Sequence, residues 1–258
     1  MSKHQKQIPL LDVLQENEQG VITPSMVHPG KKLPSHIDTA VIFFRAELSE
    51  SLLEKCKVLF EFVAAASILD QYIYDDALVI ARSPLGGPAA AGLVEELIAF
   101  GVTRFIACGS CGLIGTMNPE EFLVANKAIR DEGLSHHYLP PALFADTDAA
   151  LTKALKGALD QRGLRHREGT VWTTDAFFRE TPSKIKKRRA QGAMAVDMEC
   201  ASIAAVCRFR DVAFAQVFYF SDAIKQLSWS GFTEERHALH KRISETVVSI
   251  ALELSPSI

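Results

Sequence analysis

Two carboxylates stand close together in the last third of the sequence. Glu199 follows the apolar run Ala193–Met198, and Asp222 follows a second apolar run, Val212–Phe220. Both runs have the length and composition of buried strands, so we expect both acids at strand ends, where open α/β sheets bind their ligands. One carboxylate can hold sugar hydroxyls while the other handles a proton, and this is the pairing needed to cut a glycosidic bond.

A cluster of small residues follows a third apolar run. Arg104–Cys108 has the pattern of a strand, and Gly109, Ser110 and Gly112 come after it. Glycine lets backbone N–H groups approach a ligand closely, so we predict a loop here that can hold an anion or a sugar. A simple glycine turn is the alternative.

Two cysteines flank this predicted loop. Cys108 and Cys111 have the spacing of a redox pair, but a redox pair belongs at the start of a helix, and Cys108 completes an apolar strand. A four-cysteine zinc site needs a second close pair, and Cys200 and Cys207 are too far apart to form one. We therefore expect no metal; a redox or metal protein built on the first pair stays a separate hypothesis.

Aromatic and histidine pairs give two further signals. Phe177 and Phe178 are adjacent, and such side chains either fill a core or stack on a nucleobase. His136 and His137 are also adjacent, and neighbours on a strand point to opposite faces, so they do not suggest a shared metal ion.

The composition excludes several classes of partner. The chain has 258 residues, of which 48% are hydrophobic and 23% charged, and its formal net charge is −3. That charge gives no electrostatic argument for nucleic acid or an acidic membrane as a partner. The sequence shows neither a signal peptide nor an apolar run of about 18 residues, and its five cysteines form no framework. We expect a cytoplasmic protein with reduced thiols.

Strand and helix patterns alternate along most of the chain. The predicted strands are 40–44, 77–81, 104–108, 121–129, 169–173, 193–198 and 212–220, and the predicted helices are 89–100, 146–162, 183–191, 200–208 and 233–254. Helical spacing also predicts a helix after Ser49, through Leu52, Cys56, Leu59, Phe60 and Val63. The alternation predicts a three-layer α/β/α sandwich with a central mixed, largely parallel sheet. Residues 1–35 are expected to form an arm and residues 36–258 a single domain.

Five ordered segments together resemble the nucleoside phosphorylase superfamily, which includes purine nucleoside phosphorylases, uridine phosphorylases and methylthioadenosine/S-adenosylhomocysteine nucleosidases. These segments are Gly109–Gly112, Ile129–Gly133 with Ser135–Tyr138, Ala176–Phe178, Val196–Glu199 and Ser221–Asp222. The resemblance covers the chain from about Thr39 to its C-terminus. It implies the phosphorylase/hydrolase-like fold, a nucleoside substrate with phosphate or water, no cofactor, and a homo-oligomer that is a dimer or a hexamer.

The resemblance also implies roles for single side chains. Met198 packs on the ribose, and Glu199 accepts hydrogen bonds from its 2′- and 3′-hydroxyls. Phe177 and Ser221 bind the base, and Asp222 donates a proton toward N7 of the leaving base. The acid at that position, and the lack of a Gln-x-Arg pair after the two aromatics, favour a purine.

The phosphate site departs from the family pattern. Phosphorolytic members carry a Pro-Gly-Asp-Pro-x-Arg loop after the first strand and an arginine two residues before the Gly-Ser loop. Here the second position is Ala107, and only Arg45 lies near the first. Arg82 and Arg130 are the available substitutes beside Gly109–Ser110. Because arginine forks usually hold phosphate, the choice between phosphorolysis and hydrolysis stays open.

The predicted reaction is cleavage of the N-glycosidic bond of a nucleoside, with a purine base favoured. We expect phosphorolysis to the free base and ribose 1-phosphate, and hydrolysis by water is the alternative within the same family. A catalytically inactive nucleoside-binding protein is the alternative from another class, motivated by the missing arginines.

Overall fold

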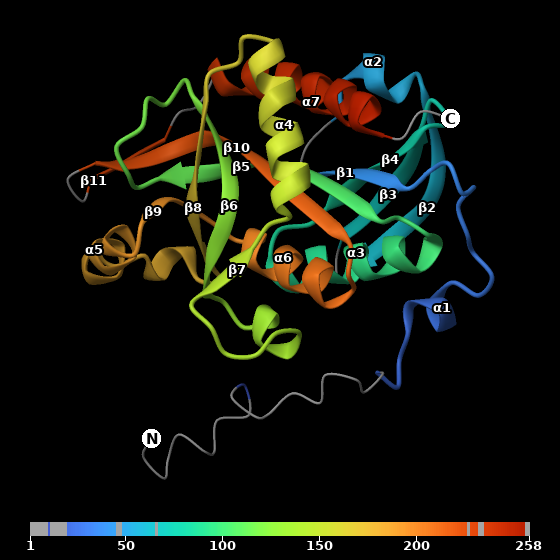
Figure 1. The fold of residues 1–258 in the computed structure, drawn as a ribbon, viewed down its shortest axis with the longest axis horizontal. Coiled ribbons are helices and arrows are strands. Elements are labelled where there is room, and N and C mark those ends of the chain that lie inside the picture. The colour runs from blue at the N-terminus through green and yellow to red at the C-terminus, as the bar shows by residue number, and fades with distance from the viewer. Residues whose placement is uncertain are drawn as a thin grey trace.

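Figure 1 shows the fold as a computed structural model, which describes Leu10 and residues 20–44, 48–64, 67–225, 228–231 and 235–255. The strands are β1 Thr39–Phe44, β2 Cys56–Ala64, β3 Ser67–Tyr74, β4 Leu78–Ser83, β5 Arg104–Leu113, β6 Phe122–Asp131, β7 Phe144–Asp146, β8 His166–Thr174, β9 Ala193–Asp197, β10 Ala213–Lys225 and β11 Ser228–Gly231. The helices are α1 Pro24–Val27, α2 Glu50–Leu53, α3 Gly87–Phe100, α4 Ala149–Gln161, α5 Pro182–Ala190, α6 Cys200–Phe209 and α7 Glu235–Leu254. Within these described residues, no helix is both long and apolar enough to cross a bilayer.

The described strands form one mixed sheet. Their order is β11-β10-β6-β8-β9-β5-β1-β4-β3-β2, and β7 pairs with β6. Five of the eleven pairings are parallel, and they join β4 to β1, β1 to β5, β5 to β10, β6 to β8, and β8 to β9. The antiparallel pairings add the edge strands and close part of the sheet on itself.

Five strands form a closed ring within this sheet. β10 pairs with both β5 and β6, and β9 pairs with both β5 and β8. β5 is the strand that changes partners: it pairs with β1 over residues 104–108 and with β9 at Gly112 and Leu113. Its small residues therefore lie where β5 leaves β1 and meets β9.

Two apolar cores lie on opposite faces of the sheet and give the fold its three layers (Figure 1). On one face, α3 and α6 pack side chains such as Leu97 and Ile203 into the first core. On the other face, α4 and α7 pack side chains such as Leu155 and Val247 into the second. The predicted α/β/α sandwich is confirmed.

A bulge in β10 changes which face its side chains occupy. Phe218 and Phe220 point into the core under α3 and α6, as alternation along a strand requires. Ser221 is an extra residue, because Phe220 pairs with Cys111 and Asp222 with the next residue of β5. Ala223 therefore returns to the first core, and Asp222 points to the opposite face.

The helix predicted through Leu52, Cys56, Leu59, Phe60 and Val63 is wrong. Only Glu50–Leu53 is helical, and the rest belongs to β2, which pairs antiparallel with β3. Phe60 and Phe62 are buried at the two-residue spacing of a strand. The helical spacing was coincidental in a segment rich in aromatic and β-branched residues, which favour strands.

Three other predictions of local structure are wrong. Gly109–Gly112 is not a loop after a strand but the second half of β5, which ends at Leu113. His136 and His137 lie in a short 3₁₀ helix, Leu134–His137, rather than on a strand. Asp222 lies three residues before the end of β10 rather than after the strand, because β10 extends to Lys225.

Candidate active site

The turn between β9 and α6 is built around Asp197. Its Oδ2 accepts hydrogen bonds from the backbone N–H groups of Glu199, at 3.0 Å, and Cys200, at 2.6 Å. Its Oδ1 accepts from the Thr173 hydroxyl at 2.6 Å. Asp197 thus satisfies N–H groups at the start of α6, as a helix N-cap does, and frees Glu199 from that role. The family resemblance assigns no role to Asp197.

Glu199 is held at the point where two helices begin. Its side chain is buried, and its Oε1 accepts a hydrogen bond of 2.6 Å from the Gly86 N–H, directly before α3. Burial, and then the negative charge of Asp197, raise the pKa of Glu199 to about 8. A fixed carboxyl group of this kind is suited to accept hydrogen bonds from hydroxyl groups. Met198, next to it, is half-buried.

The helix starts are packed so closely that one position requires glycine. A Cβ atom at Gly87 would lie 2.2 Å from the Ser202 hydroxyl oxygen. That hydroxyl donates a 2.8 Å hydrogen bond to Glu132, which is buried and also accepts from the Ser135 N–H at 2.9 Å. Glu132 therefore ties the segment after β6 to α6, a role that the sequence pattern did not reveal.

Arg130 is committed to that same segment. Its Nε and Nη2 donate to the side chain and backbone of Ser135, and its Nη1 and Nη2 donate to the carbonyls of Pro140 and Leu139, at 2.7 to 3.0 Å. The hydrogen bonds of the guanidinium therefore hold this loop in place. This geometry removes Arg130 from our set of phosphate-binding residues.

Asp222 lies against the glycine of β5 with which it pairs. A Cβ atom at Gly112 would be 3.3 Å from its Oδ2 and 3.0 Å from Cγ1 of Val196. Its Oδ1 accepts a 2.8 Å hydrogen bond from the Ser221 hydroxyl. Gly112 leaves room for the carboxyl group between β10 and β9.

β5 brings the surroundings of both acids together. Gly112 pairs with Val196 and Asp222, on opposite sides. Because β9 runs antiparallel to β5, the chain beyond Val196 runs back toward Cys111, and Cys111 interacts electrostatically with Cys200, next to Glu199. The strand that leads to Glu199 and the strand that carries Asp222 therefore flank the same short stretch of β5.

The small residues of β5 lie beside this stretch. The Ser110 side chain is exposed, whereas its neighbours in the strand are buried. A Cβ atom at Gly109 would lie 2.7 Å from the ring of Phe44, so only glycine fits against β1 here. Arg82, on β4, is half-buried near Tyr72. Arg45 lies outside the described residues.

An aromatic pair and a carboxyl group follow β8. The rings of Phe177 and Phe178 pack at a tilt of 40° with their centroids 4.1 Å apart, and the two residues are 50% and 89% exposed. They do not belong to the core. Glu180 comes next and is half-buried, and its pKa is raised to about 7 by burial and by the charge of Asp222. The sequence had not singled out Glu180.

The two cysteines of β5 do not face each other. Cys108 is buried in the core under α4 and α7, and Cys111 in the core under α3 and α6. Burial also raises the pKa of Cys108 to about 12, which disfavours the reactive thiolate. The redox hypothesis therefore fails on geometry. Among the described residues, no group of three histidine, cysteine or acidic side chains could hold a metal ion.

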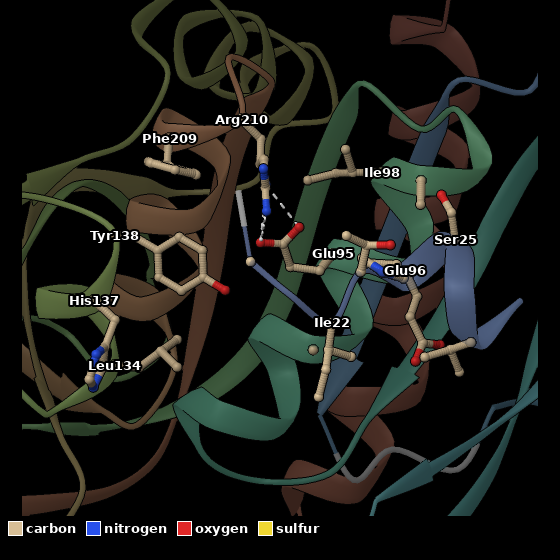
Figure 2. A pocket seen from close by; sticks show the side chains of 16 residues that line it. Ile22, Ser25, Glu95, Glu96, Ile98, Leu134, His137, Tyr138, Phe209 and Arg210 are labelled. Atoms are coloured by element: carbon tan, nitrogen blue, oxygen red, sulfur yellow. Dashed lines mark hydrogen bonds and ion pairs between the residues drawn. The ribbon is translucent and has the colours of Figure 1, made fainter. Parts of the chain in front are cut away.

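A separate cavity of about 930 Å³ lies at the far ends of α3 and α6 (Figure 2). It is lined by residues 20–27, the second half of α3, the 3₁₀ helix and the residues that end α6. Glu95 meets Arg210 there in a two-point ion pair, with Oε2–Nε and Oε1–Nη2 distances of 2.9 Å. Tyr138 packs edge-on against Phe209, with centroids 5.5 Å apart. The ten residues of α6 separate Arg210 in this cavity from Glu199, roughly 15 Å along the helix.

Comparison with known sequences points to one family. The profile of the Phosphorylase superfamily matches residues 66–254. A guanosine phosphorylase of Halorubrum lacusprofundi is 31% identical over 132 residues, which are 51% of this chain and 55% of that protein. A uridine phosphorylase of Haemophilus influenzae is 32% identical over 42% of this chain and 43% of its own. These matches span only about half of each relative's length. A DeoD-type purine nucleoside phosphorylase of Bacillus cytotoxicus is 31% identical over 66% of this chain and 71% of its own.

Solved structures share the fold at lower sequence identity. A purine nucleoside phosphorylase from Toxoplasma gondii, in complex with immucillin-H, superposes with a TM-score of 0.69 at 20% identity, over 84% of this chain and 91% of that one. The MTAN of Helicobacter pylori gives a TM-score of 0.66 at 20% identity, over 83% and 99%. The family profile covers most of the chain, and the protein therefore belongs to the phosphorylase superfamily.

Proposed function

We propose that this protein cleaves the N-glycosidic bond of a nucleoside, with a purine base favoured, by phosphorolysis to the free base and ribose 1-phosphate. The observation that carries the proposal is that the strand leading to Glu199 and the strand carrying Asp222 flank the same stretch of β5. The guanosine and purine nucleoside phosphorylases among the relatives support the choice of substrate.

Each side chain has one task in this reaction. Glu199 accepts hydrogen bonds from the ribose hydroxyls, and Met198 packs on the sugar. Phe177 and Ser221 bind the base, and the exposed ring of Phe177 is available for stacking. Asp222 donates a proton toward N7 as the bond from C1′ to the base breaks and its electron pair leaves with the base. This help is typically worth about 10²–10⁴-fold.

The second substrate attacks C1′ from the other side of the sugar. A phosphate oxygen forms the new bond and yields ribose 1-phosphate. The pocket that we propose for phosphate contains Gly109 and Ser110 with Arg45 and Arg82, of which Arg45 lies outside the described residues. Arg130 is excluded because its donors are engaged elsewhere. With water in place of phosphate, the same site would hydrolyse the nucleoside to ribose and free base, and the proton lost by water would replace the one that Asp222 delivers to the base.

A nucleoside panel with and without phosphate tests the proposal. The purified chain is incubated with adenosine, inosine, guanosine and uridine, and free base is measured by chromatography. We expect base release from the purine nucleosides that depends on phosphate. Release that is independent of phosphate would assign a nucleosidase instead.

The engaged guanidinium of Arg130 favours a second candidate, a nucleoside-binding protein without turnover. It removes one of the few replacements for the missing phosphate arginines. This candidate predicts that nucleosides raise the Tm of the protein while no base is released, with phosphate present or absent. The oligomer of the family, a dimer or hexamer, and a cytoplasmic location complete the proposal.

A further inference from the structure

Glu180 is the first residue to turn inward after an exposed segment. Residues 175–179, which include both aromatics, are exposed, and Glu180 is half-buried just before α5 begins at Pro182. Its carboxyl group forms part of no ion pair among the described residues that would explain its burial. A buried acid without a cation is costly unless it has another task.

The packing of α5 brings the segment that contains Glu180 to the strand that carries Asp222. Ile185, the buried residue of α5, shares a cluster with Val196 and with Ile224 of β10. Arg189, near the end of α5, donates a 3.0 Å hydrogen bond to the Ile224 carbonyl. Side chains two apart on a strand point the same way, so Asp222 points to the face that α5 covers, and the chain enters α5 through Glu180.

The two carboxyl groups interact, since the charge of Asp222 helps burial to raise the pKa of Glu180 to about 7. Neighbouring carboxyl groups resist double ionisation and tend to retain one proton between them. Near neutral pH such a pair presents one hydrogen-bond donor and one acceptor.

The Hoogsteen edges of purines differ in what they require of such a pair. Adenine offers an acceptor at N7 and a donor at its 6-amino group, whereas guanine offers two acceptors, N7 and O6. Hypoxanthine has the same two acceptors as guanine. One donor beside one acceptor therefore matches a 6-aminopurine and sets a lone pair against O6 of a 6-oxopurine.

We propose that Glu180 is a specificity-determining residue, which forms with Asp222 a carboxyl pair that selects 6-aminopurine nucleosides over 6-oxopurine nucleosides. This inference rests on the proposed function, because it assigns the base end of the same site. It adds a residue and a substrate class to that function.

The test compares kcat/KM for adenosine and for inosine in the wild type, in Glu180→Gln and in a control, Glu61→Gln, which alters an exposed residue of the distant strand β2. We expect the wild type to favour adenosine. In Glu180→Gln, whose amide can donate to O6, the adenosine-to-inosine ratio falls about 10-fold or more. The control keeps the wild-type ratio, and a general loss of folding would lower both values together without changing it.

Two outcomes would overturn this inference while leaving the proposed function intact: a wild type that favours inosine, or an unchanged ratio in Glu180→Gln. If no nucleoside is cleaved, the proposed function fails independently of this inference. Calorimetric binding of adenine and of hypoxanthine then tests whether Glu180 selects the base. Preference for adenine that is lost in Glu180→Gln supports the inference, and equal affinities of the wild type for both bases overturn it.

Discussion

The two ends of α3 and α6 contrast in how they treat negative charge. At the far ends, the cavity of Figure 2 is roomy, but Glu95 is matched by Arg210 at 2.9 Å. Burial raises the pKa of Glu96 there, and His28, with Nε2 3.1 Å from its Oε2, opposes that shift. At the near ends, Glu199 sits against Asp197 with burial raising its pKa. Perturbed acids cluster at functional sites, whereas matched ion pairs serve structure. The contrast teaches that the candidate site is distinguished by a buried acid held against a second acid, and not by volume.

The largest effect is expected at the acid of β10. Asp222→Asn should lower kcat on purine nucleosides by about 10²–10⁴-fold, because the amide cannot deliver a proton to the leaving base. Steady-state kinetics on inosine and adenosine measure the loss. Asp146→Asn, a change at an exposed acid of β7, is the matched control and should leave kcat unchanged. A fully active Asp222→Asn protein would remove this residue from the mechanism.

Glu199→Gln is expected to weaken sugar recognition. Above pH 8, where Glu199 is ionised, hydrogen bonds to its charged carboxylate contribute about 1.5–3 kcal/mol, so kcat/KM for ribonucleosides measured there should fall about 10- to 100-fold. The loss should be smaller for 2′-deoxynucleosides, which lack one of the hydroxyls. Equal losses for both sugar types would contradict contact between Glu199 and the 2′-hydroxyl.

The same substitution gives a signature in stability. The pKa of Glu199 is raised from 4.5 to about 8 in the folded protein, so between these values the folded chain binds more protons than the unfolded one. The contribution of Glu199 to stability therefore falls as pH rises across this window. Glutamine does not ionise, so the Tm of Glu199→Gln relative to wild type should increase by a few degrees from pH 5 to pH 9 in calorimetry. A constant difference would mean that Glu199 is not buried as described.

Two glycines offer a matched pair of smaller changes. Gly87→Ala would force a Cβ atom to 2.2 Å from the Ser202 hydroxyl, whereas Gly157→Ala, within α4, meets no atom within 4 Å. We expect the first to destabilise by about 1–3 kcal/mol and to lower activity, since it disturbs the anchor of Glu199. The second should stabilise by about 0.5–1 kcal/mol through helix propensity. Chemical denaturation measures both, and equal effects would refute the close packing.

The smallest effect is expected in the cavity. Arg210→Ala removes the partner of Glu95, but this arginine is partly exposed, so Tm should fall by only a few degrees and kcat/KM should stay within about twofold of wild type. A large loss of activity would show that the cavity belongs to the active site, and the two ends of α3 and α6 would then not differ in function.

The sequence allowed prediction of the layered fold, because alternating apolar runs are a local signal. It also pointed to Glu199 and Asp222, whose segments resemble a family. It did not reveal Glu180, because the burial of that residue depends on how α5 packs against Ile224, far away in sequence. Asp197 could have been recognised, since an acid just before a helix is a common cap.

Other failures have the same physical origin. The residues from Leu52 to Val63 have helical spacing, but most of them form β2 because they pair with β3, and this pairing is a tertiary contact that local spacing does not show. The sequence suggests that Arg130 is a free cation, but the loop after β6 accepts hydrogen bonds from all three nitrogens of its guanidinium. Residue type indicates what a side chain is able to bind, and its neighbours decide whether it is still able to do so.

The extra residue in β10 has a consequence for how this chemistry could be lost or gained. If Ser221 paired with Gly112 in regular register, without the bulge, strict alternation would turn Asp222 inward, among the packed hydrocarbon beneath α3 and α6. The protein would keep its whole composition and lose its proposed proton donor to the interior. A shift of one residue in strand register thus separates a sheet that presents this acid from one that would bury it.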